Sequence, residues 1–152
     1  MMVVRLTVAS QEFGAMLQPV ERKSIELIIA LDVSNSMNAQ DIEPSRLERA
    51  KQAIARLTDR LVNDRLGLIV FAGQAYTQLP ITSDYASAKM FLSNINTEIV
   101  PTQGTAMGAA INLAVESFSE QEDVNRAIIV ITDGENHEDD AMGAAKQAAE
   151  LG

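Results

Sequence analysis

One short stretch limits the folds open to this chain, because a fully apolar segment there ends abruptly in small polar residues. The segment spans residues 27–31 (LIIAL), and Asp32, Ser34, Asn35 and Ser36 follow it. An apolar run of this length, rich in Ile and Leu, is typical of a strand that is covered on both faces of a sheet. Asp32 would then stand at the end of that strand, with the two serines in the loop behind it.

The polar residues of this stretch allow two interpretations. A carboxylate and two hydroxyls that converge in one loop suit a hard cation such as Mg²⁺. An Asx or Ser turn that caps a helix would use the same residue types. Residues 32–36 alone do not decide between a metal site and a cap.

The strand pattern recurs twice, and amphipathic helices separate the copies. Residues 66–72 (LGLIVFA) and 127–132 (AIIVIT) are apolar runs, whereas residues 45–62 place apolar side chains at helical spacing. Residues 75–79 alternate and stop at Pro80, which predicts an antiparallel edge strand. Further helices are predicted after the cap residues 82–84, over residues 106–118, and from Asp139 or Asp140 to Leu151.

Buried strands that alternate with amphipathic helices predict an α/β fold, namely a Rossmann-like, doubly wound sheet that is mostly parallel with one antiparallel edge strand. Ligands bind such sheets beyond the carboxyl ends of the strands. Asp32 and Asp133 follow two of these ends, and Thr105 stands at a helix N-terminus on the same expected edge. The chain therefore offers five oxygen-bearing side chains on one rim, which are Asp32, Ser34, Ser36, Thr105 and Asp133.

Composition bounds the size of the fold and the class of partner. The chain has 152 residues, which fits one domain, and 47% of them are hydrophobic. The formal net charge of -9 argues against nucleic acid or an anionic membrane as the main partner. The chain has no cysteine, so disulfides and thiolate chemistry are excluded. No stretch reaches the roughly 18 apolar residues of a membrane span.

The two ends of the chain suggest a piece of a longer protein. Residues 1–23 have no clear period and are assigned to an N-terminal extension, although residues 3–8 have the composition of a strand. No strand follows the last predicted helix, and a right-handed βαβ crossover would need one. We therefore expect an open apolar edge at residues 127–132 that pairs with another copy of the chain. Coverage of that edge by residues 1–20 would overturn this expectation.

Three short motifs together resemble the metal-ion-dependent adhesion site that marks von Willebrand factor A (VWA) domains. They are DVSNS at residues 32–36, GT at residues 104–105 and TDG at residues 132–134. The D-x-S-x-S pattern alone occurs by chance, but all three parts at the right edges of an α/β chain form a specific signal. The resemblance covers residues 24–152 and implies a VWA domain that lacks the family's last strands and final helix.

Longer segments resemble the bacterial Bat-type aerotolerance proteins, among them ALDVSNSM, LGLIVFAG, PTQGTAMG and ITDGENHEDD. In that subfamily, hydrophobic segments before and after the A domain tether it to the cell membrane, so the resemblance implies a membrane-associated full-length protein. The genes commonly neighbour those of MoxR-type AAA+ ATPases. The resemblance therefore implies a role in assembling or maturing envelope or redox proteins, with other Bat-type proteins or such an ATPase as partners.

The resemblance also assigns roles to the five rim residues. It implies that Ser34, Ser36 and Thr105 give hydroxyl oxygens to Mg²⁺, or to Mn²⁺ or Ca²⁺, and that Asp32 and Asp133 give carboxylates directly or through water. Two carboxylates only just balance a divalent charge, so the cation stays electrophilic. An Asp or Glu of a protein partner can then replace a water, which is how the family adheres. This implies a metal-dependent interaction domain and not an enzyme.

Plainer interpretations of single residues remain open. Thr105 could cap a helix, and Asp133 could be a turn residue beside Gly134. An acidic loop beside the site is expected to be solvated, or else to shape the choice of partner. It holds Glu135, His137, Glu138, Asp139 and Asp140.

Two other function classes also compete with the interaction domain. A Mg²⁺-dependent hydrolase or phosphoryl-transfer enzyme would need a nucleophile or base beside the metal and a group that holds phosphate. The three site loops contain no Lys or Arg, and no phosphate-binding glycine motif is present. A purely structural domain with a vestigial site is the third class, and it predicts no effect of chelation.

Overall fold

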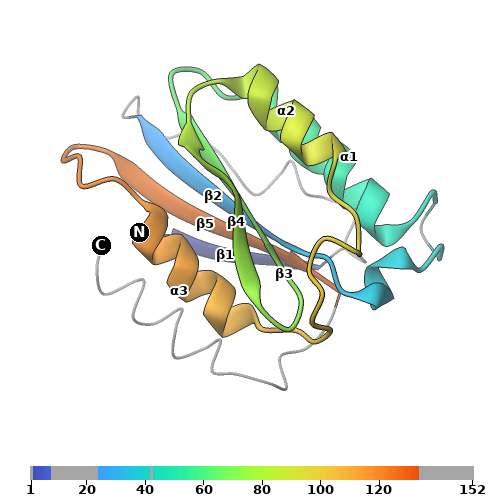
Figure 1. Ribbon diagram of the computed structural model, residues 1–152. Coiled ribbons are helices and arrows are strands. Elements are labelled where there is room, and N and C mark those ends of the chain that lie inside the picture. The colour runs from blue at the N-terminus through green and yellow to red at the C-terminus, as the bar shows by residue number, and fades with distance from the viewer. Residues whose placement is uncertain (1, 8–23, 42, 134–152) are drawn as a thin grey trace.

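A mixed sheet forms the centre of the fold. The computed structural model describes residues 2–7, 24–41 and 43–133, and within them one five-stranded sheet has the order β1-β5-β2-β3-β4 (Figure 1). All neighbouring strands are parallel except β4, which runs antiparallel to β3. The predicted sheet is therefore confirmed. Its strands are β1 (Met2–Thr7), β2 (Ile25–Asp32), β3 (Arg65–Phe71), β4 (Ala75–Thr82) and β5 (Asn125–Thr132).

Helices cover both faces of this sheet (Figure 1). The helical elements are the 3-10 turn η2 (Asn35–Asn38), α1 (Arg46–Thr58), α2 (Tyr85–Ser93) and α3 (Met107–Ser117). Leu27, Ile29 and Leu31 of β2 enter the core under α1 and α2, whereas Ile28 and Ala30 enter the core under α3. Because alternate residues of one strand face two separate cores, the strand must be apolar throughout. The doubly wound architecture is thus confirmed.

Side-chain caps decide where two of the helices begin. Ser45 Oγ accepts a hydrogen bond of 3.1 Å from the backbone N–H of Glu48, so α1 starts at the next residue. Asp84 Oδ1 accepts one of 3.1 Å from the N–H of Ser87 and starts α2 in the same way. The cap predicted at residues 82–84 is confirmed as Asp84.

The end of α1 differs from its prediction, which placed it at residue 62. The helix stops at Thr58, and the chain then turns through Asn63, whose φ is 59°. The carboxylate of Asp64 accepts the N–H of Val62 at 3.2 Å and the N–H of Ile25 at 3.0 Å. The bond to Ile25 joins this turn to the start of β2, a long-range contact that helical periodicity cannot show.

The outer edge of β5 is covered, so the prediction of an open edge there is wrong. β1 pairs with β5 in parallel, from Met2 opposite Ala127 to Thr7 opposite Thr132. An edge strand presents unpaired N–H and C=O groups, and residues 2–7 supply the extended segment that satisfies them. The strand suggested at residues 3–8 is therefore real, and the expected dimer through this edge loses its basis.

The other edge strand, β4, continues past Pro80, where the sequence predicted that it would stop. Its register with β3 shifts twice between Leu66 and Ile69. An edge strand tolerates a residue without an N–H, so proline does not end it. A Cβ on Gly67 would lie 3.3 Å from the backbone oxygen of Leu79, so β4 packs closely against this glycine of β3.

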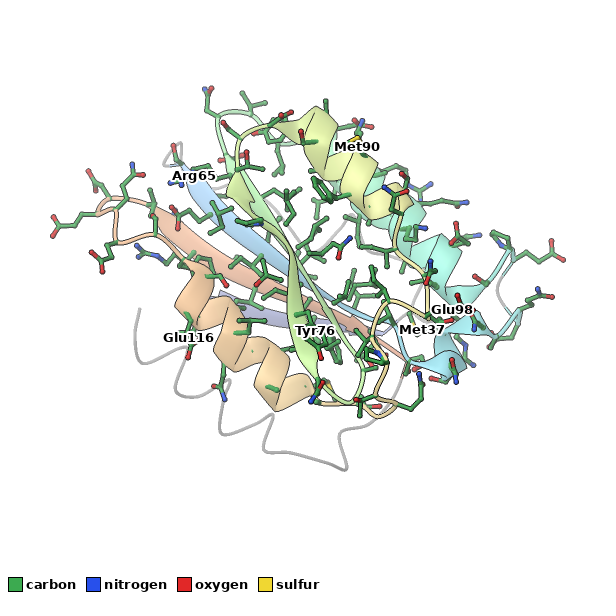
Figure 2. All side chains as sticks on the ribbon, in the orientation of Figure 1. Met37, Arg65, Tyr76, Met90, Glu98 and Glu116 are labelled. Carbon is green, nitrogen blue, oxygen red and sulfur yellow. The ribbon has the colours of Figure 1, made fainter. Side chains whose placement is uncertain are left out.

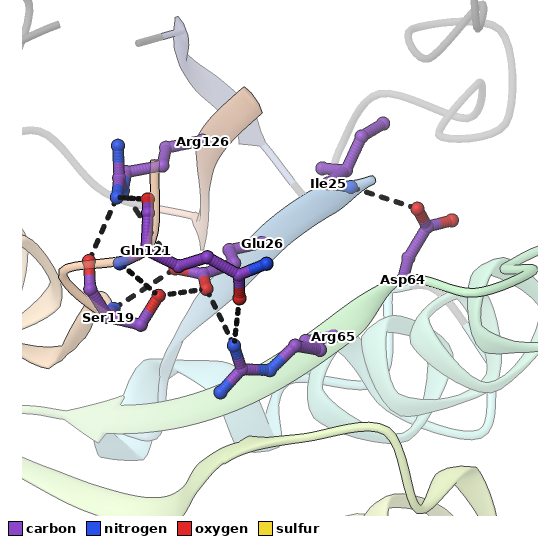
Figure 3. Close-up of polar contacts among 7 residues, drawn as sticks. All are labelled: Ile25, Glu26, Asp64, Arg65, Ser119, Gln121 and Arg126. Carbon is purple, nitrogen blue, oxygen red and sulfur yellow. Dashed lines mark hydrogen bonds and ion pairs between the residues drawn. The ribbon is translucent and has the colours of Figure 1, made fainter. Parts of the chain in front are cut away.

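At the amino ends of the strands, one buried carboxylate joins β2, β3 and the α3–β5 connection (Figure 3). Glu26 is fully buried and accepts hydrogen bonds from Arg65 Nη1 at 2.9 Å and from the backbone N–H of Ser119 at 3.0 Å. The hydroxyl of Ser119 also donates to it, and Arg126 Nε lies 3.8 Å away. Because these donors come from separate segments, Glu26 fixes the α3–β5 connection against the sheet.

Replacing Glu26 by Ala should lower the free energy of unfolding by about 2–4 kcal/mol, because buried donors and a paired guanidinium lose their acceptor. Ser119→Ala removes only one hydroxyl donor and should cost about 1 kcal/mol. Urea denaturation of both variants measures the difference. Equal losses would show that the carboxylate is not the anchor of this connection.

Candidate metal centre

Four of the five predicted rim residues are linked at the carboxyl edge of the sheet. Asp32 ends β2, and Asp133 directly follows β5, the parallel neighbour of β2. Ser34 Oγ and Ser36 Oγ, at the start of η2, are 3.0 Å apart. Ser36 Oγ then donates a hydrogen bond of 3.1 Å to Asp133 Oδ1. The structure therefore brings together polar side chains from two loops that lie far apart in the sequence.

Apolar neighbours anchor the two serines. Val33 and Met37 are fully buried in the core under α1 and α2, and Figure 2 labels Met37 at this end of the sheet. The backbone N–H of Met37 donates to the oxygen of Ser34 at 3.0 Å, which closes the η2 turn. Burial on both sides of the serines thus holds their hydroxyls at the sheet edge.

Asp32 is fixed by two hydrogen bonds in a fully buried position. Its Oδ1 accepts the backbone N–H of Ser34 at 2.8 Å, and its Oδ2 accepts the hydroxyl of Thr132 at 2.7 Å. Burial raises the pKa of Asp32, and the nearby Asp133 raises it further, although the hydrogen bonds from Thr132 and Ser34 oppose this shift. Both donors to Asp32 are neutral, so they leave the charge of an ionised carboxylate unbalanced. A bound cation would supply the missing positive charge and stabilise the ionised form.

Thr105 reaches the same edge from the α2–α3 connection. The following residue, Ala106, donates its N–H to the oxygen of Ala72 at 2.7 Å, just beyond β3. Gln103 Oε1 accepts the N–H of Asn35 at 3.0 Å and so joins this connection to the serine loop. The N-cap residue of α3 is Ala106 and not Thr105. The alternative that the side chain of Thr105 caps this helix stays a prediction.

Two glycines allow this connection to lie so close to the strand end. The N–H of Gly73 donates to Thr102 O at 2.7 Å. A Cβ on Gly73 would lie 2.6 Å from Gln103 O and 2.9 Å from Thr102 O. Gly104 has a φ of 145°, which L side chains rarely adopt. The contact that requires glycine at position 73 comes from a segment distant in the sequence, so no local pattern predicts it.

Arg46 is a site residue that the sequence analysis missed. Its Nη1 lies 2.5 Å from Asp133 Oδ2, while Nε and Nη2 donate to the two carboxylate oxygens of Asp41 at 2.9 and 2.8 Å. The hydrogen bonds that Arg46 donates to Asp41, and then the one to Asp133, raise the pKa of Arg46. The site loops themselves contain no basic residue. The guanidinium comes from the first turn of α1, which packs beside η2.

The spacing of the oxygens fits a small divalent cation. In an octahedral shell with bonds of about 2.0–2.1 Å, adjacent ligand atoms lie about 2.9 Å apart. The oxygens of Ser34, Ser36 and Asp133 are separated by 3.0 and 3.1 Å in succession. In the part of the chain that the structure describes, no group of three or more His, Cys, Asp or Glu side chains is placed to hold a metal. A cation here would therefore depend on hydroxyl oxygens and water as well as on two carboxylates.

The acidic loop and the last predicted helix lie outside the described residues. The loop's effect on partner choice stays a prediction, and so does the helix from Asp139 or Asp140 to Leu151. The same holds for the assignment of residues 1–23 to an extension and of residues 24–152 to the domain.

Comparison with known families and structures agrees with this geometry. A model of the von Willebrand factor type A domain matches residues 27–135, from β2 to just beyond β5. The chain therefore belongs to the von Willebrand factor type A domain family. Domains of this family are generally interaction or adhesion modules.

Two solved bacterial structures place the chain more narrowly. BatB from Bacteroides thetaiotaomicron is 67% identical, with a TM-score of 0.83 over 85% of this chain and 63% of that chain. An aerotolerance-related membrane protein from Bacteroides fragilis is 62% identical, with a TM-score of 0.82 over 85% of this chain and 64% of that one. The resemblance to Bat-type aerotolerance proteins is thus confirmed.

More distant relatives share part of this likeness. An uncharacterised protein of Borreliella burgdorferi is 34% identical over 110 residues, 72% of this chain and 32% of the relative. The chain thus spans about a third of that relative's length. Proximal thread matrix protein 1 from mussel byssus, solved with a zinc-occupied MIDAS motif, is 20% identical. Its TM-score of 0.74 over 86% of this chain and 34% of that chain shows a likeness of fold alone. Within the described residues, no helix is long and apolar enough to cross a membrane.

Gly73→Ala should lower the free energy of unfolding by about 1–3 kcal/mol, because the added Cβ would collide with the backbone of the α2–α3 connection. Gly67→Ala is the matched control, since its Cβ would lie 3.2 Å from a flexible atom of Ile81 and 3.3 Å from Leu79 O. The control should cost less than Gly73→Ala. Thermal unfolding compares the two, and the reverse order would contradict the close approach at Gly73.

Proposed function

We propose that this domain is a protein-interaction module whose carboxyl-edge site binds a divalent cation, with Mg²⁺ the first choice and Mn²⁺ or Ca²⁺ as alternatives. The observation that carries the proposal is the convergence of oxygens from Ser34, Ser36 and Asp133, linked at 3.0 and 3.1 Å, beside the buried carboxylate of Asp32. The proposed ligands are these three residues together with Thr105 and Asp32, directly or through water. Asp32 contributes a buried carboxylate whose own donors are neutral.

The charge of the site favours an acidic partner. Two carboxylates only just balance a divalent cation, and one of them, Asp133, is already shared with Arg46. When bound, the cation would supply an electrophilic position that a carboxylate can occupy in place of water. An exposed Asp or Glu of a partner protein therefore has the chemistry to complete the site.

The described surface has no contiguous apolar patch that could serve as an alternative docking area. Its exposed large hydrophobic residues are Val62, Tyr76 and Met90, which lie on separate elements, and Figure 2 shows Tyr76 and Met90 far apart. Contiguous apolar patches commonly mark interaction surfaces, whereas single exposed residues are ordinary. This supports the polar edge of the sheet as the interaction site.

The relatives suggest where this module works. The Bacteroides fragilis protein is described as an aerotolerance-related membrane protein. We therefore extend the proposal to a domain of a bacterial, membrane-tethered, aerotolerance-type protein. Partners of the chemistry required include other Bat-type proteins and a MoxR-type AAA+ ATPase, provided that they present an acidic side chain.

A hydrolase or phosphoryl-transfer enzyme has less support from the site. Such an enzyme needs a cation that is available to hold phosphate. Arg46 is the basic residue that the described contacts bring to the site, and its guanidinium is engaged by Asp41 and Asp133. An interaction module does not need a basic side chain that is available to hold phosphate.

Addition of Mg²⁺ or Mn²⁺ to chelator-treated protein should raise the melting midpoint in a saturable way. At a hundredfold excess over the dissociation constant, binding to the folded state adds about 2.7 kcal/mol, which corresponds to roughly 5–10 °C for a chain of this size. Asp32→Ala should abolish the rise, since it removes the buried carboxylate.

Asp84→Asn is the matched control for this titration. Asp84 follows β4, whose last residue, Thr82, pairs with Leu66 near the start of β3, so it lies at the opposite edge of the sheet. Asparagine also caps helices well. The control should respond to metal like the unaltered protein. A midpoint that no metal moves in either would contradict the proposed metal site.

The Mn²⁺-loaded protein should enhance the relaxation of water protons, and a peptide with an accessible Glu should reduce this enhancement. The reason is that the peptide carboxylate would replace a water on the cation. A peptide with Gln in place of Glu is the matched control and should leave the relaxation unchanged. An identical response to both peptides would argue against recognition of an acidic partner.

A further inference from the structure

Arg46 is an unusual neighbour for a cation site, because it is itself a fixed positive charge. Its guanidinium bonds Asp133 on one side and both oxygens of Asp41 on the other. The side chain of Asp133 is 5% exposed, whereas that of Asp41 is 54% exposed. Arg46 is therefore held between a buried carboxylate of the site and a solvated carboxylate outside it.

The two oxygens of Asp133 have different partners. Oδ2 pairs with Arg46, and Oδ1 accepts the hydroxyl of Ser36, whose oxygen also lies 3.0 Å from Ser34 Oγ. The guanidinium thus neutralises the very carboxylate that faces the serine hydroxyls. A cation bound by the serines and Asp133 would have to share Asp133 with Arg46, and like charges repel.

We propose that Arg46 is a built-in counter-charge that limits the cation affinity of this site, and that Asp41 moderates its effect. The inference rests on the proposed function, because it concerns the affinity of the same site. Arg46 is a positioning residue that acts through Asp133. A site weakened in this way holds its cation firmly only when a further carboxylate arrives, so metal binding and partner binding reinforce each other.

Two effects of removing Arg46 oppose each other. Loss of the guanidinium removes repulsion, which tightens metal binding, but it also frees Asp133, which weakens binding. The hydrogen bond from Ser36 to Asp133 Oδ1 does not involve Arg46, so we expect it to persist in the variant. Much of the positioning of Asp133 is therefore retained, and the loss of repulsion dominates.

Arg46→Met should tighten Mg²⁺ binding by about tenfold in calorimetric titration of chelator-treated protein, because a side chain of similar length loses its charge. Asp41→Asn should weaken binding by about two- to threefold, since it leaves Arg46 less compensated and solvent screens the exposed Asp41. The two members of one ion pair should thus shift the affinity in opposite directions. A merely structural role for the pair predicts the same direction for both.

Arg49→Met is the matched control for net charge. Arg49 lies on the same helix, and among the described contacts its Nη1 donates to the backbone oxygen of Glu43 at 3.4 Å. The control removes the same charge without touching Asp133 and should leave the Mg²⁺ affinity within about twofold. Equal tightening in Arg49→Met and Arg46→Met would overturn the specific role of Arg46.

The melting midpoint without metal gives a second readout. Arg46→Met should lower this midpoint, because Asp133 loses its counter-ion, yet the variant should show the larger rise on adding Mg²⁺. If Arg46→Met does not fold, the Mg²⁺ affinities of Asp41→Asn and Arg46→Lys are compared with that of the unaltered protein. Lysine keeps the charge and should leave the affinity near that of the unaltered protein, while Asp41→Asn should still weaken it.

The outcomes separate this inference from the proposed function. No Mg²⁺ or Mn²⁺ binding by the unaltered protein would overturn the proposed function. Binding by the unaltered protein, with equal or weaker binding by Arg46→Met, would overturn only the role of Arg46. Unchanged or tighter binding by Asp41→Asn would likewise overturn the part assigned to Asp41.

Discussion

The parallel pairing of β2 with β5 brings the two carboxylates of the site to the same end of the sheet. In register, Leu31 lies opposite Ile131, so the next residue of each strand emerges at the same edge. Thr132 can then donate its hydroxyl to Asp32 at 2.7 Å. Asp133 follows at once beside the serine loop. The pairing itself comes from two apolar strands that fill cores on both faces, so the burial of aliphatic side chains places the polar ones.

Two buried acidic side chains at opposite edges of this sheet show how surroundings decide the role of a carboxylate. Glu26 accepts from Arg65 and from Ser119, with Arg126 close by, so its charge is compensated inside the protein. Asp32 accepts only neutral donors among its described hydrogen bonds, and burial raises its pKa. The charge of Glu26 is thus balanced within the protein, and its hydrogen bonds join separate segments. The charge of an ionised Asp32 is not balanced by its neutral donors, so a bound cation can balance it.

The close approach of backbone to backbone completes the edge. The α2–α3 connection bonds the chain just beyond β3 through Gly73 and Ala72, and it bonds the serine loop through Gln103. Through these contacts, main-chain hydrogen bonds hold the connection that carries Thr105 at this end of the sheet. Arg46 enters from α1 in the same indirect way, because the cap at Ser45 starts that helix beside η2. The site is thus assembled from segments that separate sets of hydrogen bonds hold in place.

Local patterns predicted the buried strands, the fold class and the cap of α2, because apolar periodicity, helix caps and short loop motifs act over a few residues. They also named the five rim residues as candidates. Packing between distant segments sets which strand β1 joins, that β4 passes Pro80, why position 73 is glycine, and that Arg46 meets Asp133. Each of these depends on contact between segments distant in the chain. Such contacts leave no period in a single sequence, since they are set by how the elements pack and not by their local preferences.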